Sequence, residues 1–295
     1  IYGNVPDILS QLIRTAFVPR PGYKFLVADF SAIEARVLSW LAGEQWRLDV
    51  FKTHGKIYEA SASAMFGVDI DLIRKGNPEY ALRGKGKIAE LALGYQGGKG
   101  SLISMGALNM GLAEEELPDI VRRWRGSNRR IVDFWYAVER YALDTVRHGT
   151  TGYMPCGVAF ERDEDYLSIV LPGGRRLYYY KPEIRQNDLG RDAIHFRGVD
   201  QKTKKWGMIS TYGGKLTENI VQAVARDLLA NSLMNLYRAG FIIDFHIHDE
   251  VILEVPEDSG RTLEEAVSCM CCLPGWAAGL PLDADGFESY YYKKD

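Results

Sequence analysis

The chain has 295 residues, which is enough for one large domain or for two subdomains in close contact. Hydrophobic residues make up 46% of the chain and charged residues 25%, an ordinary balance for a soluble globular protein. No apolar run approaches the roughly 18 residues that span a bilayer, and the chain does not start with a signal peptide. We therefore expect no membrane partner and a cytoplasmic location. The net charge of −3 gives no overall sign of a polyanion-binding protein.

The first half of the sequence predicts a strand followed by many helices. Residues 24–29 form an apolar run that follows a Pro-Gly turn and ends in Asp29, which is typical of a buried strand. Apolar residues then recur at helical spacing from Ser31 to Gly43, where the glycine is placed to cap a helix. From Asp49 to Arg140 the pattern is mostly helical, with breaks at glycine and proline.

The second half changes from a helical to a β pattern and back. Thr150 to Gly214 is rich in glycine and tyrosine and contains alternating segments, which predict β-hairpins. Leu216 to Ala239 predicts one long helix that Gly240 ends. Phe241 to Val255 predicts a strand, a tight turn and a second strand, and the turn carries His-Asp-Glu at 248–250.

Positive charge gathers in two stretches of the helical region, although the chain is acidic overall. Such clusters usually form a solvated helix face, and they also suit contact with nucleic acid. The first cluster comprises Arg74, Lys75, Arg83, Lys85, Lys87 and Lys99, and the second comprises Arg122, Arg123, Arg125, Arg129 and Arg130. The clusters alone leave both interpretations open.

Two carboxylates at strand ends predict a site for divalent metal ions. Asp29 ends one apolar strand and Asp249 lies at the tip of a hairpin, so two strands of one sheet could place them side by side. Paired aspartates are the hard ligands that a two-magnesium phosphoryl-transfer site needs. Glu250 follows Asp249 and is expected to point to the other face of the sheet or to its rim. The alternative is that Asp29 is a helix cap and Asp249 a turn residue, and a two-metal nuclease would use similar acids.

A stripe of residues four apart predicts a nucleotide-binding helix. Arg83, Lys87, Leu91 and Tyr95 lie on one drifting face of a helix. The two cations suit the phosphates of a nucleoside triphosphate, and the ring suits its base. An exposed amphipathic helix with a core tyrosine is the alternative, which the pattern leaves open.

Three segments together resemble the motifs of the family A DNA polymerases. Residues 27–38, Val-Ala-Asp-Phe-Ser-Ala-Ile-Glu-Ala-Arg-Val-Leu, look like motif A. The spacing Arg83-(x3)-Lys87-(x7)-Tyr95 looks like motif B, and residues 247–256, Ile-His-Asp-Glu-Val-Ile-Leu-Glu-Val-Pro, look like motif C. The resemblance covers nearly the whole chain, and residues 90–98 with the long β insertion look most like the phage and prophage branch.

The resemblance implies the ligands of the metal site. Asp29 and Asp249 would bind two Mg²⁺ ions, for which Mn²⁺ could substitute, and the backbone carbonyl of Phe30 would be a further ligand. Glu250 would be a further catalytic carboxylate. In such a site two-metal nucleotidyl transfer adds dNTPs to a primer 3′-hydroxyl.

The resemblance also implies roles in nucleotide and DNA binding. Arg83 and Lys87 would hold the triphosphate, Tyr95 would lie beside the templating position, and Glu34 would be a steric gate against ribonucleotides. Gln222 and His248 would contact the minor groove of the duplex. Three positions depart from the family pattern. Leu91 stands where many members have an aromatic residue, and Tyr58 stands near the place of a phosphate-contacting histidine. Gln96 replaces the glycine that usually follows the motif B tyrosine.

The implied fold is α+β: a polymerase palm with an antiparallel sheet flanked by helices, and helical fingers inserted between its segments. We expect residues 1–44 and 215–295 to form the palm, 45–149 the fingers and 150–214 a β-rich insertion. The thumb and exonuclease domains are expected to be absent, so a thumb would come from the same protein or from another polypeptide. The expected partners are primer–template DNA and dNTPs, in the host cytoplasm if a phage encodes the chain. A catalytically inactive remnant that binds primer–template is the alternative function.

Overall fold

The computed structural model describes residues 12–187 and 189–293. The chain divides into two compact units. The first unit contains the segments up to Ile33, Ala225–Ala278 and from Leu282 onward, and the second contains Glu34–Val224 and Gly279–Pro281. Helix α9 (Gly213–Arg238) begins in the second unit and ends in the first.

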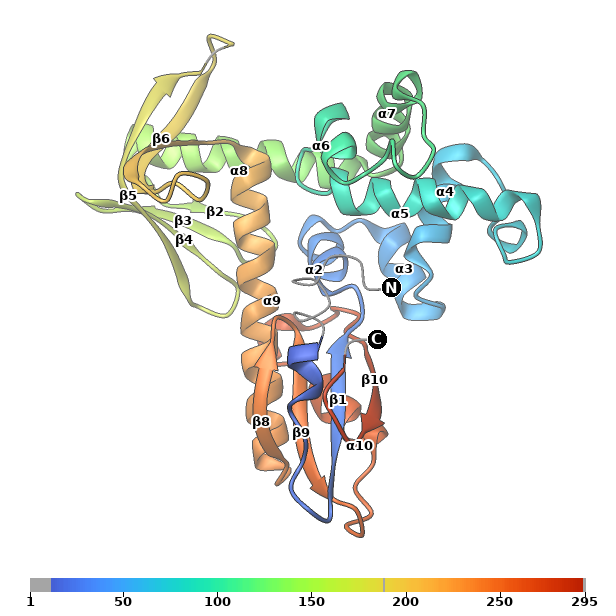
Figure 1. Cartoon of the computed structure of the whole chain (residues 1–295). Coiled ribbons are helices and arrows are strands. Elements are labelled where there is room, and N and C mark those ends of the chain that lie inside the picture. The colour runs from blue at the N-terminus through green and yellow to red at the C-terminus, as the bar shows by residue number, and fades with distance from the viewer. Residues whose placement is uncertain (1–11, 188, 294–295) are drawn as a thin grey trace. The chain divides into compact units, whose positions relative to one another are not determined.

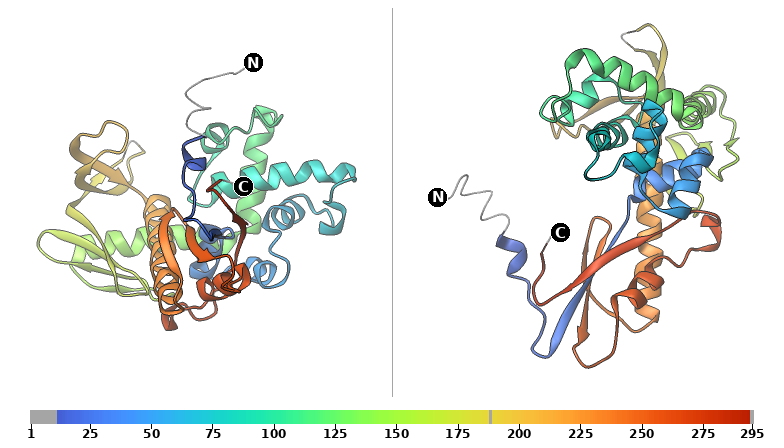
Figure 2. Two further views of the ribbon diagram at one scale, coloured as in Figure 1. Left: turned by 60° about the horizontal axis from the view of Figure 1, so that its bottom comes forward. Right: turned by 90° about the vertical axis from the view of Figure 1, so that its right-hand side faces the viewer.

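The first unit is built on an antiparallel sheet of four strands in the order β10-β1-β9-β8. Its strands are β1 (Tyr23–Phe30), β8 (Ile242–Ile247), β9 (Glu250–Pro256) and β10 (Ala284–Ser289). Figures 1 and 2 show these strands side by side. Strand β1 is a central strand that pairs on one edge with β9 and on the other with β10, and its apolar run is buried.

Alternate residues of this sheet form an apolar core on one face. Phe25, Val27 and Ile252 pack there with Tyr292 from the end of the described chain, and Phe245 closes the cluster. Helix α10 (Leu263–Met270) contacts β1 and β10, and the short 3-10 helix η4 spans Gly275–Ala277. The two faces of β1 are therefore both covered for most of its length.

Helices make up most of the second unit up to His148. The longer ones are α2 (Ile33–Ala42), α3 (Gln45–Thr53), α4 (Ile57–Phe66), α5 (Ala81–Leu93), α6 (Lys99–Ser104), α7 (Leu117–Ser127) and α8 (Arg129–His148). Short 3-10 helices are η1 (Ile70–Leu72), η2 (Pro78–Tyr80) and η3 (Glu114–Glu116). Gly43 follows α2 with a φ of 67° and Gly149 follows α8 with a φ of 68°, a left-handed conformation in which glycine ends a helix without steric cost.

The predicted β-rich insertion is a six-stranded antiparallel meander in the order β2-β3-β4-β5-β6-β7. Its strands are β2 (Gly152–Tyr153), β3 (Ala159–Arg162), β4 (Tyr166–Val170), β5 (Arg176–Gln186), β6 (Asp192–Val199) and β7 (Trp206–Thr211). Helix α8 contacts strands β2 to β6 and lies against one face of the sheet (Figure 2). The register of β5 and β6 shifts between Tyr180 and Glu183, where Lys181 takes a φ of 47°.

Candidate active site

Strand pairing in the first unit brings the two predicted metal-binding aspartates together. Ile247 pairs with Glu250, so His248 and Asp249 form a two-residue turn at the tip of the β8–β9 hairpin. Across the neighbouring ladder Asp29 lies directly opposite Glu250. Opposite residues of antiparallel strands share one face, so Glu250 shares the face of Asp29 rather than pointing to the other face.

A third carboxylate, which the sequence did not predict, lies on the same face. Asp285 of β10 is directly opposite Asp29 on the strand's other side. A hollow of about 230 Å³ is lined by Val27, Asp29, Phe30, Ser31, Glu250, Asp285, Gly286 and Phe287. The strand order therefore gathers acids from three strands around one small cavity.

The electrostatics of Asp29 show how closely these acids interact. The pKa of Asp29 is raised to about 6, first by partial burial and then by the negative charges of Asp249 and Glu250. A backbone hydrogen bond with Phe30 offsets part of this rise. The repulsion between neighbouring carboxylates is reduced when one of them binds a proton or when the group binds a cation.

The donors present suit magnesium better than a metal that needs many protein ligands. The described residues hold no group of three or more His, Cys, Asp or Glu side chains arranged to bind a metal ion. Magnesium commonly keeps several waters and takes one or two carboxylates together with substrate phosphates. Asp29 and Asp249, with the carbonyl of Phe30, fit that pattern.

Tyr292 holds the carboxylate of Glu250 in position through a hydrogen bond. Its hydroxyl donates a hydrogen bond to Oε1 of Glu250. The Tyr292 side chain is buried, and its ring packs edge-on against Phe245 with 5.6 Å between centroids. Burial and the neighbouring carboxylate raise the pKa of Tyr292 to about 12, so the hydroxyl keeps its proton and remains a donor. No sequence motif marks this tyrosine.

His248 occupies the first position of the turn in an unusual backbone conformation. Its φ is 55°, in the left-handed region that residues other than glycine seldom adopt, and its side chain is exposed. Strained residues of this kind cluster at functional sites. Nearby on the hairpin, His246 lies 3.3 Å from the guanidinium of Arg226, a contact that the sequence did not predict.

The second unit brings together two of the predicted nucleotide-binding residues. Arg83 on α5 donates from Nε to Oε1 of Glu59 at 2.7 Å. The same guanidinium lies 5.4 Å from the ring centroid of Tyr58, which is on α4 next to Glu59. Burial raises the pKa of the Tyr58 hydroxyl, so this group stays a hydrogen-bond donor. Glu59 orients Arg83, a role that no sequence motif marks.

Two further residues of the predicted stripe, Lys87 and Leu91, are accessible to solvent, whereas Tyr95 is half-buried. Lys87 is exposed and makes no ion pair with another described residue, and Leu91 is 51% exposed. Tyr95 lies just beyond the end of α5, in the turn that follows it. The spacing of four therefore places Arg83, Lys87 and Leu91 on one helix, and Tyr95 lies outside it.

Tyr95, Glu34 and Gln222 form a small hydrogen-bonded group in the second unit. The hydroxyl of Tyr95 donates to Oε2 of Glu34 at 2.6 Å, and Nε2 of Gln222 donates to Oε1 at 3.3 Å. Burial and the charge of Glu34 raise the pKa of Tyr95, so its hydroxyl remains protonated. Three predicted site residues from distant segments therefore meet at one carboxylate.

Glu90 anchors helix α5 to helices α3 and α7. Arg47 and Glu90 form a buried ion pair with a hydrogen bond of 2.8 Å, and their side chains are 1% and 4% exposed. The indole of Trp124 donates to the same carboxylate at 2.9 Å, and Asn128 accepts from Arg47 at 3.0 Å. A buried pair needs this degree of hydrogen bonding to offset its desolvation.

Comparisons with known proteins identify relatives of the chain. The model of DNA polymerase family A matches residues 3–139. The DNA polymerase of Bacillus phage SP02 is 54% identical over 296 residues, which cover 100% of this chain and 45% of that polymerase. The thermostable DNA polymerase I of Thermus filiformis is 28% identical over 271 residues, which cover 90% of this chain and 26% of that enzyme.

The fold also has a solved counterpart. The POL domain of Pol1 from M. smegmatis, in complex with a DNA primer-template and dNTP, matches with a TM-score of 0.64 at 21% identity. The match covers 95% of this chain and 42% of that one, and it confirms the α+β polymerase fold. By sequence the chain is similar to the family A DNA polymerases, as its three motifs predicted. It spans less than half the length of the relatives named here.

No helix in the described ranges, residues 12–187 and 189–293, is long and apolar enough to cross a membrane.

Proposed function

We propose that this chain carries the palm and fingers of a DNA-templated DNA polymerase, which adds dNTPs to the 3′-hydroxyl of a primer. The observation that carries the proposal is the pairing of β1 with β9, which brings Asp29 of motif A beside the turn that holds Asp249 of motif C. The kinship with named DNA polymerases supports the same reaction.

In the proposed reaction the acids of the first unit bind divalent metal. Asp29 and Asp249 would bind Mg²⁺, with the carbonyl of Phe30 as a further ligand. Two bound Mg²⁺ ions supply activation of the primer hydroxyl and stabilisation of the leaving pyrophosphate. Glu250, whose carboxylate is held by the hydroxyl of Tyr292, would add negative charge next to the metal ligands.

The cations of α5 would hold the triphosphate. Lys87 is exposed and makes no ion pair with the described residues, so its ammonium is available to an anion. Arg83 is only partly committed to Glu59, since 35% of its side chain remains exposed. Tyr58 would add a hydroxyl donor beside Arg83, and Leu91 would face the sugar.

Selection of the sugar and the base pair would rest on a second set of residues. Glu34 would occupy the space of a ribose 2′-hydroxyl and so favour deoxynucleotides. Tyr95 would support Glu34 and lie beside the templating base. Gln222 and His248 would contact the minor groove of the primer–template duplex, where the shape of the pair is read more than its sequence.

We further propose that the palm comprises residues 1–44 and 215–295, the fingers 45–149 and the β insertion 150–214. A thumb, supplied by the same protein or by another polypeptide, would grip the duplex through phosphate contacts. The relatives are long enough to hold further domains, because this chain covers 45% of the SP02 polymerase.

Replacement of a metal ligand tests the proposal. Asp249→Asn in the thumb-containing protein should lower nucleotide incorporation by roughly a thousandfold or more, since metal ions contribute several kcal/mol to such reactions. Asp258→Asn is the matched control, because Asp258 is an exposed residue beyond the end of β9. Primer extension measured with Mg²⁺ should be unchanged in the control. Equal incorporation by both variants would reject the assignment.

A further inference from the structure

The sheet of the β insertion has one covered face and one exposed face. Leu167, Ile169 and Tyr179 alternate on the face that lies against helices, where Tyr179 accepts a hydrogen bond from Asn219 of α9. Residues that alternate with these point to the opposite face. The register places Tyr166, Tyr180, Arg197 and Met208 in one row across β4, β5, β6 and β7 on that opposite face.

Four aromatic rings form a continuous row on the exposed face. The ring of Tyr166 lies 5.7 Å from that of Tyr178 and 5.3 Å from that of Tyr180. Tyr180 in turn lies 6.4 Å from Trp206. Tyr178 and Trp206 are each 61% exposed, although large aromatic side chains are usually buried. These four residues are called the aromatic row below.

Positive charge accompanies the aromatic row. Residues 150–214 contain ten Lys and Arg against eight Asp and Glu, a net charge of +2 in a chain whose total is −3. Arg197 is exposed in the row of Tyr180 and makes no ion pair with another described residue. The β6–β7 turn next to Trp206 adds Lys202, Lys204 and Lys205.

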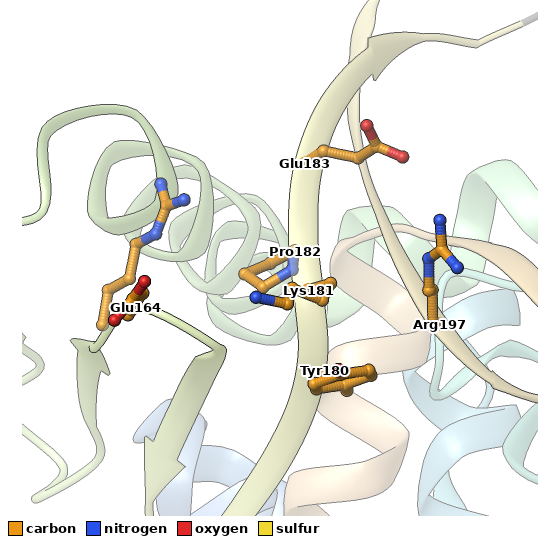
Figure 3. Close-up of a pocket in the computed structure, with 7 residues that line it drawn as sticks. Glu164, Tyr180, Lys181, Pro182, Glu183 and Arg197 are labelled. Atoms are coloured by element: carbon orange, nitrogen blue, oxygen red, sulfur yellow. The ribbon is translucent and has the colours of Figure 1, made fainter.

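The acids of this face are largely neutralised by neighbours. In Figure 3, Tyr180, Lys181 and Pro182 lie between Glu164 on one side and Arg197 on the other. These residues line a hollow of about 380 Å³. Glu183 pairs with Arg185 at 2.6 Å, and Lys181 pairs with Asp165. Arg176 pairs with Glu161 at 3.0 Å. Glu164 and, in the β6–β7 turn, Asp200 remain, and Arg197 with the three turn lysines outnumbers these two acids, so the balance of the unpaired charge is positive.

We propose that the aromatic row and Arg197 form a binding surface for single-stranded DNA. Proteins that bind single strands combine cations for the backbone with aromatic rings on which successive bases stack. An open sheet face with rings in a row and unpaired cations offers both. A protein partner would be favoured by an apolar patch with few charges, whereas here the exposed rings are bordered by cations on two strands and a turn.

Base stacking on the rings and phosphate contacts with Arg197 should affect single-strand binding in different ways. Loss of a stacking ring typically weakens single-strand binding roughly 5- to 100-fold. Loss of a phosphate contact lowers the salt dependence, with a slope change of about 0.7 per contact for single strands. Ring variants should therefore change affinity at all salt concentrations, and the Arg197 variant should change the slope.

The test measures binding of a short fluorescein-labelled oligothymidylate to the full chain by fluorescence anisotropy. The variant Tyr178→Ala/Trp206→Ala should bind at least about tenfold more weakly, and Arg197→Gln should reduce the salt slope. Tyr136→Ala, which removes a 51% exposed ring on α8, is the control and should bind like the parent chain. Circular dichroism checks that each variant is folded, and Tyr178→Phe, which keeps a ring, should retain binding.

Two outcomes would overturn the proposal. If the folded double variant binds oligothymidylate with unchanged affinity, the face does not bind single-stranded DNA, and a protein partner becomes the better explanation. If the Tyr136→Ala control loses as much affinity as the double variant, the effect is non-specific. The inference does not rest on catalysis: Asp249→Asn should bind the oligothymidylate normally. If the chain does not polymerise, the proposed function is rejected. If mutation of the aromatic row still weakens oligothymidylate binding in that case, this inference stands.

Discussion

The carboxylate of Glu34 is held by hydrogen bonds at both of its oxygens. Its two oxygens accept hydrogen bonds from different segments, Tyr95 at 2.6 Å and Gln222 at 3.3 Å. A carboxylate held by a charge-assisted bond keeps one position at little further entropic cost. A fixed side chain discriminates by shape better than a mobile one, which suits the role of a gate.

The gate is tested by its selectivity. Glu34→Ala should lower the preference for dNTPs over ribonucleotides by at least about tenfold, because the space of the 2′-hydroxyl is opened. Tyr95→Phe keeps the ring but removes the donor, so it should lower the preference to a smaller extent. Single-nucleotide incorporation with each sugar measures both. Unchanged selectivity in Glu34→Ala would contradict the gate, whatever the change in rate.

Residues whose position depends on the packing of distant segments could not be predicted from the sequence. Asp29 and Asp249 could be predicted because a strand end and a hairpin tip are visible in the pattern. Asp285 and Tyr292 could not, because their proximity to Asp29 and Glu250 depends on β10 pairing with β1 and on the path of the last residues. Glu59 was missed for the same reason, since its contact with Arg83 joins two helices.

At the scale of elements, α5 depends on close backbone approach. A Cβ at Gly86 would lie 2.1 Å from the carbonyl oxygen of Tyr58 and 3.1 Å from Cβ of Ala62 on α4. The glycine thus sets the distance between the helix that carries Arg83 and the helix that carries Tyr58. A Cβ at Gly84 would meet only the end of the Met110 side chain at 3.6 Å, an ordinary contact.

These two glycines give a matched pair of variants. Gly86→Ala should destabilise the protein by about 2 kcal/mol or more, because α4 or α5 must move. Gly84→Ala should be neutral or stabilise by up to about 1 kcal/mol, since alanine favours the helix more than glycine does. Urea unfolding measures both, and dNTP affinity should fall only in Gly86→Ala. Equal stability of the two variants would show that the close approach is not required.

The types and bounds of individual helices and strands could be predicted from the local pattern of apolar residues. The predicted helix at 216–239 is observed at Gly213–Arg238, and the predicted strand at 24–29 lies within Tyr23–Phe30. Both carry an unbroken apolar pattern between turn signals. Pairing did not follow, because the order β10-β1-β9-β8 is decided by contacts between distant segments. The predicted boundaries at 44 and 214 stay predictions.

For the molecule as a whole, the acid cluster of the first unit ties stability to pH and metal. The pKa of Asp29 is raised from 3.8 to about 6, so the folded state binds more protons than the unfolded state between these values. The contribution of Asp29 to stability is therefore greatest at low pH and is lost as the pH rises through about 6. A bound Mg²⁺ ion would replace the proton as the counter-charge.

Magnesium should therefore stabilise the chain in a pH-dependent manner. With Mg²⁺ about tenfold above its Kd, the melting temperature should rise by a few degrees near pH 7.5. The rise should shrink near pH 5, where protons compete for Asp29. Asp249→Asn should lose most of the rise, and Asp258→Asn should keep it. A shift that is independent of pH and of Asp249 would place the magnesium elsewhere.

The most direct test of the central claim is template-directed addition of a single nucleotide. A primer–template with a defined next base is incubated with Mg²⁺ and each dNTP in turn, using the chain together with the proposed thumb, from the same protein or from another polypeptide. We predict that the complementary dNTP is added, that mismatched dNTPs are added far more slowly, and that chelation of Mg²⁺ stops the reaction. Absence of incorporation, together with absence of Mg²⁺-dependent dNTP binding, would contradict the assignment of this chain as a polymerase.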